Sequence, residues 1–381
     1  MLAINVKTQT KECKPLFISD FPVDEISING GIEASTWLLV NSLYTLYGIR
    51  SIILAPDPRA QADSIEIHDF GSTYRIRISG LPNQKIETVN KYTRLLSESA
   101  DFNIVHLQGY ASYKSPPGIP RVLTIHGVPE ATSKHEKNFL RKILKYHLDL
   151  KPEIRARNLE SNIILISNYL KSIISDGSEK KYWRINNPVS PIFFRAADNK
   201  KSKRMIFVGR ITAVKDLENL FRGFRIFLDI DDSYQLLIVG PGLGTKYGKR
   251  AQMLASKLGL HPNLVFAGNL TQEEIALEFS KSAFLVLSSR QETAPMVIGE
   301  ALAMGLPVLA TNVGGVAEMV EEPTAGMIVP PSDPVALARG MDILSKSNTN
   351  FSQNAIDASR FYSHNFVAKE VFEVYKQILD C

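Results

Sequence analysis

The sequence is poor in cysteine and has no long apolar run. Its two cysteines, Cys13 and Cys381, lie near the two ends of the 381 residues, which excludes a disulfide framework and a cysteine-based metal site. No apolar stretch approaches the roughly 18 residues of a membrane-spanning helix, and the first residues lack the apolar core of a signal peptide. These absences predict a cytoplasmic protein. With 44% apolar and 22% charged residues, the chain is long enough for two globular domains.

The positive charge of the chain is concentrated in one segment. Between Lys134 and Arg157 there are eight basic and three acidic residues, an excess as large as the +5 of the whole chain. Apolar residues recur there at helical spacing, opposite a basic face. Two interpretations stay open: the helix packs on a core with a solvated outer face, or it lies on the anionic inner face of the cell membrane. Nucleic acid is not an expected partner, because no aromatic residues alternate with the charges.

The N-terminal half begins as a doubly wound sheet does. A strand over 15–19 leads to Gly30 and Gly31, then to a helix that ends near Tyr47 and to a strand over 52–55. At the carboxyl end of a first parallel strand, such a glycine pair allows the backbone to approach a ligand.

Two histidines lie at or near the ends of later strands of this half. His106 is expected to be structural. His126 is followed by Gly127, which allows a sharp turn at the strand end where ligands of open sheets bind, so His126 is a candidate site residue. The strands are expected over 74–78, 103–107, 122–125, 163–166 and 182–185.

The pattern restarts after a polar linker over 196–203. A strand over 205–208 ends before Arg210, and Lys215 begins an amphipathic helix that runs to Leu228. Two cations at a strand end and a helix start would neutralise a diphosphate as it becomes a leaving group.

The segment 289–311 contains two glutamates in a loop and a helix. A buried strand precedes it, Pro295 starts the helix and Gly305 stops it. Glu292 lies in the loop and Glu300 inside the helix, so both face the crevice at the helix N-terminus. Carboxylates that accept from hydroxyl groups, beside free amides that can hold phosphate, suit a nucleotide-sugar. The residues expected to contribute this stretch of backbone are Thr293, Ala294, Pro295 and Met296.

Together with Gly314 and Gly315 after the next strand, this segment resembles the donor-site signature of family 4 of the retaining glycosyltransferases, which have the GT-B fold. Val208-Gly-Arg-x4-Lys215 and Thr124-x-His-Gly127 match the same family. The loop departs from the usual Glu-Gly-Phe-Gly. Here it reads Glu292-Thr-Ala-Pro-Met, which keeps the amides and both glutamates but changes the shape of the sugar pocket.

The resemblance implies an α/β protein with two Rossmann-like doubly wound domains that face a central cleft. Residues 1–195 would bind the acceptor and residues 204–361 the nucleotide-sugar donor. A helix over 362–381 would cross back to the N-terminal domain.

The resemblance also assigns roles in the cleft. Arg210 and Lys215 would hold the diphosphate, Glu292 the sugar hydroxyls and Glu300 the ribose, while His126 would complete the closed site. Further contacts with the donor are expected from the backbone of Gly30, Gly31, Asn269, Leu270, Gly314 and Gly315.

The implied reaction is transfer of a sugar, with retention, from a nucleoside-diphosphate-sugar to a hydroxyl acceptor. The acceptor would be a saccharide, free or lipid-linked, in the synthesis of a cell-surface polysaccharide. Neither a cofactor nor a metal is expected. Asp229-Ile-Asp231 matches a metal-binding pattern of another transferase fold, but it lies between a helix and a strand, where a solvated turn is expected.

Three alternatives are weighed against this reaction. A nucleotide-sugar 2-epimerase shares the architecture but needs carboxylates placed to move a proton on the sugar ring, and the sequence offers no such set. A catalytically dead scaffold would not need Arg210, Lys215, Glu292 and Glu300 together. A nicotinamide-dependent oxidoreductase is disfavoured because no G-x-G-x-x-G follows the first strand.

Overall fold

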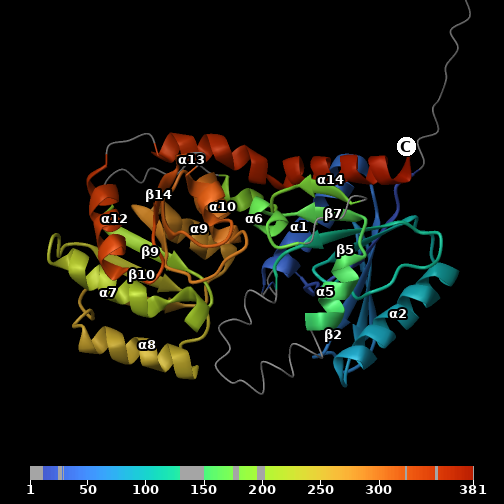
Figure 1. Cartoon of the computed structure of the whole chain (residues 1–381), viewed down its shortest axis with the longest axis horizontal. Coiled ribbons are helices and arrows are strands. Elements are labelled where there is room, and N and C mark those ends of the chain that lie inside the picture. The colour runs from blue at the N-terminus through green and yellow to red at the C-terminus, as the bar shows by residue number, and fades with distance from the viewer. Residues whose placement is uncertain are drawn as a thin grey trace, which may run out of the picture.

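The chain folds into two α/β domains, as expected from the sequence (Figure 1). The computed structural model describes residues 12–24, 28, 30–128, 150–174, 180–194, 202–321, 324–347 and 351–380. Each domain is built on its own sheet, and the carboxyl ends of both sheets face a central cleft.

The first sheet has the strand order β3-β4-β2-β1-β5-β6-β7-β8, in which β3 runs antiparallel to β4 and the other neighbours are parallel. Its central strands are short apolar runs because helices cover both faces. The bounds are β1 Pro15–Ile18, β2 Ser51–Asp57, β3 Ser64–His68, β4 Gly71–Arg77, β5 Ile104–Gln108, β6 Arg121–Ile125, β7 Asn162–Leu165 and β8 Lys181–Arg184.

Two separate cores cover the faces of this sheet. On one face, Phe17 of β1 is buried with Leu43 of α1 and Tyr375 of α14. On the other face, Leu16 is buried with Leu96 of α2. Helix α14 therefore returns from the second domain to pack beside α1, as Figure 1 shows along its upper edge. The helices of this domain are α1 Gly31–Tyr47, α2 Pro82–Ser99, α5 Lys151–Asn158, α6 Asn168–Lys171 and α14 His364–Leu379.

The second sheet is parallel throughout, with the order β11-β10-β9-β12-β13-β14. One large core holds it, including the fully buried Phe207 of β9 and Phe284 of β12. Its strands are β9 Arg204–Val208, β10 Gln235–Val239, β11 Leu264–Gly268, β12 Phe284–Leu287, β13 Val308–Thr311 and β14 Gly326–Val329. Its helices are α7 Leu217–Leu228, α8 Lys246–Lys257, α9 Gln272–Ser280, α10 Met296–Ala303, α11 Val316–Val320, α12 Pro334–Lys346 and α13 Phe351–Ser359.

Most differences from the sequence prediction are shifts of one or two residues at element ends. Helix α7 begins at Leu217, because a short 3₁₀ turn over Ala213–Lys215 comes first. Helix α10 begins one residue after Pro295, which is its N-cap. Strand β3 was not predicted. Asp229 and Asp231 lie in the turn after α7, and each is paired with a basic residue, Arg225 and Lys203 respectively.

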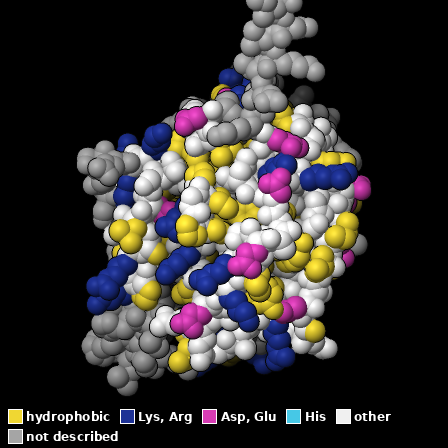
Figure 2. Space-filling model, turned by 90° about the vertical axis from the view of Figure 1, so that its right-hand side faces the viewer, with side chains coloured by type: hydrophobic (Ala, Val, Ile, Leu, Met, Phe, Trp, Pro, Cys, Tyr) yellow, Lys and Arg dark blue, Asp and Glu magenta, His cyan; other side chains and the backbone are white. Residues whose placement is uncertain are grey.

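Most of the basic segment 134–157 lies outside the described residues, which resume at Leu150, and so does most of the predicted linker. Within the described chain, no helix combines the length and apolarity needed to cross a membrane. On the end face of the N-terminal domain, basic side chains lie among acidic and apolar ones (Figure 2).

Candidate functional site

The candidate site is a cleft of about 1580 Å³ between the carboxyl ends of the two sheets. Most of the residues predicted from the sequence line it, although they come from loops far apart in the chain. The N-terminal domain contributes Gly30, Gly31 and His126. The C-terminal domain contributes Arg210, Lys215, Asn269, Leu270, Glu292, Thr293, Ala294, Pro295, Met296 and Glu300.

Lys215 and Glu292 form an ion pair in the wall of the cleft. Lys215 Nζ lies 2.5 Å from Glu292 Oε1, and Ser289 Oγ donates to the same oxygen at 2.6 Å. Both charged side chains keep some exposure, 20% for Lys215 and 12% for Glu292, so a ligand can reach them. The pair brings a cation for phosphate and an acceptor for hydroxyl groups to one place. Both residues were predicted from the sequence as site residues. Their contact with each other and the hydrogen bond from Ser289 were not predicted.

The first turn of α10 borders the cleft beside this pair. Pro295, Met296 and Val297 all line it, so the free backbone N–H groups at this helix end are available to an anion. Met296 also lies opposite Gly31, where an added Cβ would be 3.5 Å from its sulfur. The loop before α10 therefore lies close to the start of α1 across the cleft.

Gly314 and Gly315 support the loop of Glu292 from behind rather than line the cleft. A Cβ on Gly314, which has φ +56°, would lie 1.7 Å from the carbonyl oxygen of Glu292. The backbone N–H of Gly315 donates to the carbonyl oxygen of Thr293 at 3.1 Å. The two glycines therefore pack against this loop as only glycine permits, and their direct approach to a donor stays a prediction.

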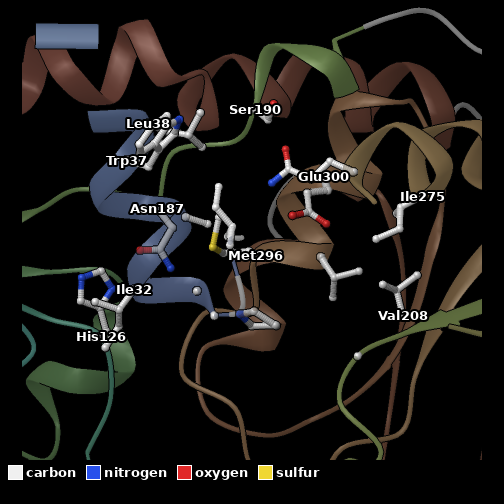
Figure 3. Close-up of a pocket in the computed structure, with 18 of the residues that line it drawn as sticks. Ile32, Trp37, Leu38, His126, Asn187, Ser190, Val208, Ile275, Met296 and Glu300 are labelled. Atoms are coloured by element: carbon white, nitrogen blue, oxygen red, sulfur yellow. The ribbon is translucent and has the colours of Figure 1, made fainter. Parts of the chain in front are cut away.

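Glu300 lies on the side of α10 that faces the cleft (Figure 3). Burial raises the pKa of its carboxyl group to about 7. A carboxylate in such a place gains much from hydroxyl donors, because they replace the water it has lost. This environment suits a group that binds two vicinal hydroxyls of a ribose.

His126 sits on the opposite wall, at the end of β6. Its Nε2 lies 2.6 Å from Gln108 Oε1, and Asn187 lies beside the ring (Figure 3). Burial lowers the pKa of His126 to about 4, and Asn187 opposes this more weakly. Gln108 and Asn187 were not predicted as site residues, although Gln108 ends the strand next to that of His126.

The two domains also touch behind the cleft. Both carboxylate oxygens of Glu318 in α11 accept from the backbone N–H of Asn168 at the start of α6, at 3.0 and 3.1 Å. Arg184 Nη2 lies 3.8 Å from the same carboxylate. Nearby, Gln291 Nε2 donates to Tyr169 Oη at 3.1 Å. The loop of Glu292 is therefore flanked by contacts between the domains.

Within the described residues, no group of three or more histidine, cysteine, aspartate or glutamate side chains could hold a metal ion. The basic side chains that line the cleft are those of Arg210 and Lys215.

Sequence comparison relates the chain to glycosyltransferases. Residues 190–360 match the family described as "Glycosyl transferases group 1". An uncharacterized glycosyltransferase of Methanocaldococcus jannaschii is 30% identical over 46% of this chain and 45% of its own length. A D-inositol 3-phosphate glycosyltransferase of Streptomyces scabiei is 32% identical over 38% of this chain and 36% of its own length. The matched part thus spans less than half of these relatives.

Solved structures match over nearly the whole chain, at low identity. Sucrose-phosphate synthase from Thermosynechococcus elongatus has a TM-score of 0.76 at 18% identity, covering 97% of this chain and 99% of that one. A trehalose-6-phosphate synthase has a TM-score of 0.70 at 10% identity, covering 96% and 99%. These likenesses show the fold. Residues 190–360 therefore match the glycosyl transferases group 1 family, in a chain with the two-domain GT-B fold.

Proposed function

We propose that this chain transfers a sugar from a nucleoside-diphosphate-sugar to a hydroxyl acceptor, with retention at the anomeric carbon. The observation that carries the proposal is the contact of Lys215 with Glu292 in one cleft with Glu300 and the N-terminus of α10. These groups are complementary to the parts of such a donor: phosphates, sugar hydroxyls and ribose hydroxyls.

The proposed binding mode follows from their positions. Arg210, Lys215 and the first turn of α10 hold the diphosphate and stabilise its charge as it leaves. Glu292 accepts hydrogen bonds from the sugar and Glu300 from the ribose. The loop of Asn269 and Leu270 lies where the base would reach it. Because two cations already face the diphosphate, the reaction would not require a metal ion.

The acceptor would enter from the N-terminal wall, past Gly30, Gly31 and His126. We propose a saccharide or a lipid-linked saccharide, used for a polymer of the cell surface. A place in the cytoplasm, on the inner face of the membrane, would suit a lipid-linked acceptor, with the basic segment 134–157 as the contact. Closure of the two domains would exclude water and so limit hydrolysis of the donor.

A thermal-shift screen with UDP, GDP, ADP and CMP, with and without Mg²⁺, tests the donor site. A ligand at about 100 times its Kd adds roughly 2.7 kcal/mol to stability, which shifts melting visibly. We expect one nucleoside diphosphate to shift melting without Mg²⁺. No shift with any of the four would overturn the proposal and favour a scaffold role. Product analysis with donor but no acceptor then separates a transferase from a 2-epimerase, which would change the sugar on its own.

A further inference from the structure

A continuous chain of hydrogen bonds joins helix α14 to the cleft through the first domain. His106 Nδ1 lies 2.6 Å from Tyr375 Oη, and His106 Nε2 lies 2.7 Å from Thr124 Oγ1. Gln108 Nε2 lies 3.2 Å from the same His106 nitrogen, and Gln108 Oε1 lies 2.6 Å from His126 Nε2. His106, Gln108, Thr124 and Tyr375 are buried, so water does not compete for these bonds.

The chemistry of each group sets the direction of the chain. A neutral imidazole has one N–H and one lone pair, an amide NH₂ donates, and an amide oxygen accepts. His106 stays neutral because burial lowers its pKa to about 3. Since Gln108 donates through its NH₂ group to His106 Nε2, the hydrogen of His106 is on Nδ1, where it meets Tyr375. The oxygen of Gln108 then requires a hydrogen on Nε2 of His126.

We propose that Gln108 is a positioning residue that holds His126 as its Nε2–H tautomer, with the Nδ1 lone pair available beside the cleft. Gln108 is in turn oriented by His106, Thr124 and Tyr375. The tautomer is a property of the folded chain. Only its use in catalysis rests on the proposed function.

The consequence of this tautomer appears at Asn187. Its Nδ2 donates to the carbonyl oxygen of Ala294 at 3.3 Å. Its buried Oδ1 makes no hydrogen bond of good geometry within the described residues, yet Asn187 lies close enough to His126 to raise the pKa of that ring slightly. Figure 3 places this amide beside the His126 ring. Nδ1 of the ring and Oδ1 of Asn187 are then both acceptors, and no donor hydrogen lies between them. A substrate hydroxyl that reaches His126 would donate to Nδ1, and an added proton would go to the same atom.

The opposite arrangement is well defined. If the amide of Gln108 were reversed, its NH₂ group would face His126, His106 would carry its hydrogen on Nε2, and His126 would be the Nδ1–H tautomer, able to donate to Asn187. The two arrangements differ in which nitrogen of His126 is protonated, and this is directly measurable.

The experiment is nuclear magnetic resonance of the full chain labelled with ¹⁵N-histidine, at a pH near 7.5, with His126→Gln to identify the signals. We expect the Nε2–H tautomer in the wild type. Glutamate at position 108 still accepts from Nε2 of His126, so Gln108→Glu should keep this tautomer and raise the pKa of His126. Gln108→Leu should release the Nδ1–H tautomer, because Asn187 can then accept. Thr73→Val, which removes a fully buried hydroxyl of β4 outside the chain of bonds, is the control and should change nothing at His126.

Transfer assays then test the role of the tautomer. We expect turnover of Gln108→Leu to fall by roughly tenfold to a hundredfold, the scale of misplacing a catalytic group, with unchanged nucleotide affinity. The pH profile of Gln108→Glu should move to higher pH. An Nδ1–H tautomer in the wild type, or an unchanged one in Gln108→Leu, would overturn the proposal. If Gln108→Leu does not fold, the wild type and Gln108→Glu decide. Because the spectra need no substrate, they stand even if no nucleotide binds.

Discussion

Arg290 donates two hydrogen bonds to the carboxylate of Asp216, from Nε to Oδ2 at 2.7 Å and from Nη2 to Oδ1 at 2.8 Å. Asp216 is 1% exposed and has φ +49°, a left-handed conformation that costs energy for a residue with a side chain. It directly follows Lys215. Two further bonds fix the same segment: the N–H of Arg290 donates to Val214 O, and Ser288 Oγ donates to Lys215 O. The ion pair therefore places the backbone from which Lys215 reaches Glu292.

Loss of Arg290 should destabilise the protein through Asp216. Arg290→Ala leaves a buried carboxylate without its cation, and we expect a loss of about 2 kcal/mol in unfolding free energy. This is less than the roughly 3–5 kcal/mol of a fully buried pair, because Arg290 is itself 42% exposed. Urea unfolding measures the loss. The double variant Asp216→Gly/Arg290→Ala should regain part of it, since glycine removes both the charge and the strain. A double variant less stable than Arg290→Ala would contradict this account.

Glu292 should be needed for transfer and not for folding. Glu292→Ala removes the carboxylate that accepts from Lys215 and Ser289, and we expect turnover to fall by roughly a hundredfold or more. Melting should change only modestly, because Lys215 keeps access to water and only the buried Ser289 hydroxyl loses an acceptor. Glu98→Ala, at an exposed position of α2, is the matched control. Near-normal turnover of Glu292→Ala would remove this residue from the site.

Glu300 should make stability depend on pH. Its pKa is about 7 in the folded protein and 4.5 in the reference state, so the folded state holds its proton more tightly. The stabilisation is complete below about pH 4.5 and is lost as the pH rises through 7. Glu300→Gln lacks this dependence, so its stability relative to the wild type should be higher at pH 8 than at pH 4.5. Unfolding curves at both pH values test this, and an equal difference at both would be inconsistent with a raised pKa of Glu300.

Glu318 should favour contact between the domains. Glu318→Ala removes the acceptor for the backbone N–H of Asn168 and the partner of Arg184. We expect a larger radius of gyration in X-ray scattering and weaker donor binding, while each domain stays folded. Glu321→Ala, an exposed position at the end of α11, serves as the control. Equal scattering from both variants would show that other contacts hold the domains together.

The basic segment gives a test of membrane contact. Replacing Lys142 and Lys145 by alanine removes two charges, each worth about 1 kcal/mol near an anionic surface. Binding to phosphatidylserine vesicles in a sedimentation assay should weaken, and binding to neutral vesicles should not change. If binding to both kinds of vesicle stays the same, the acceptor need not be membrane-bound.

The sequence predicts the parallel strands well, because apolar runs such as 205–208 become buried strands whatever surrounds them. Strand β3 was missed because its isoleucines, Ile65 and Ile67, are 63% and 76% exposed, so no buried face marks it. Its pairing with β4 decides its structure.

Cleft residues could be predicted where the residue type and its position after a strand already indicate a role in binding. Lys215 and Glu292 follow strands whose carboxyl ends meet, and their types suggest a ligand. Gln108 and Asp216 have no such signal. Gln108 acts on His126 and is oriented by His106, which in turn meets Tyr375, 269 positions away from His106. Asp216 acts through Arg290, so the roles of both residues exist only after the chain has folded.

Helix α14 bears on the order in which the protein can be made. Val367, Val371 and Tyr375 are buried in the core that also holds Trp37 and Leu43 of α1. The ribosome delivers α1 early and α14 only after the whole second sheet has been synthesised. The N-terminal domain is therefore synthesised first, and its sheet face beside α1 stays uncovered until α14 is made. The second domain can complete its core before that. We would expect chaperones that act during translation to bind this uncovered apolar face.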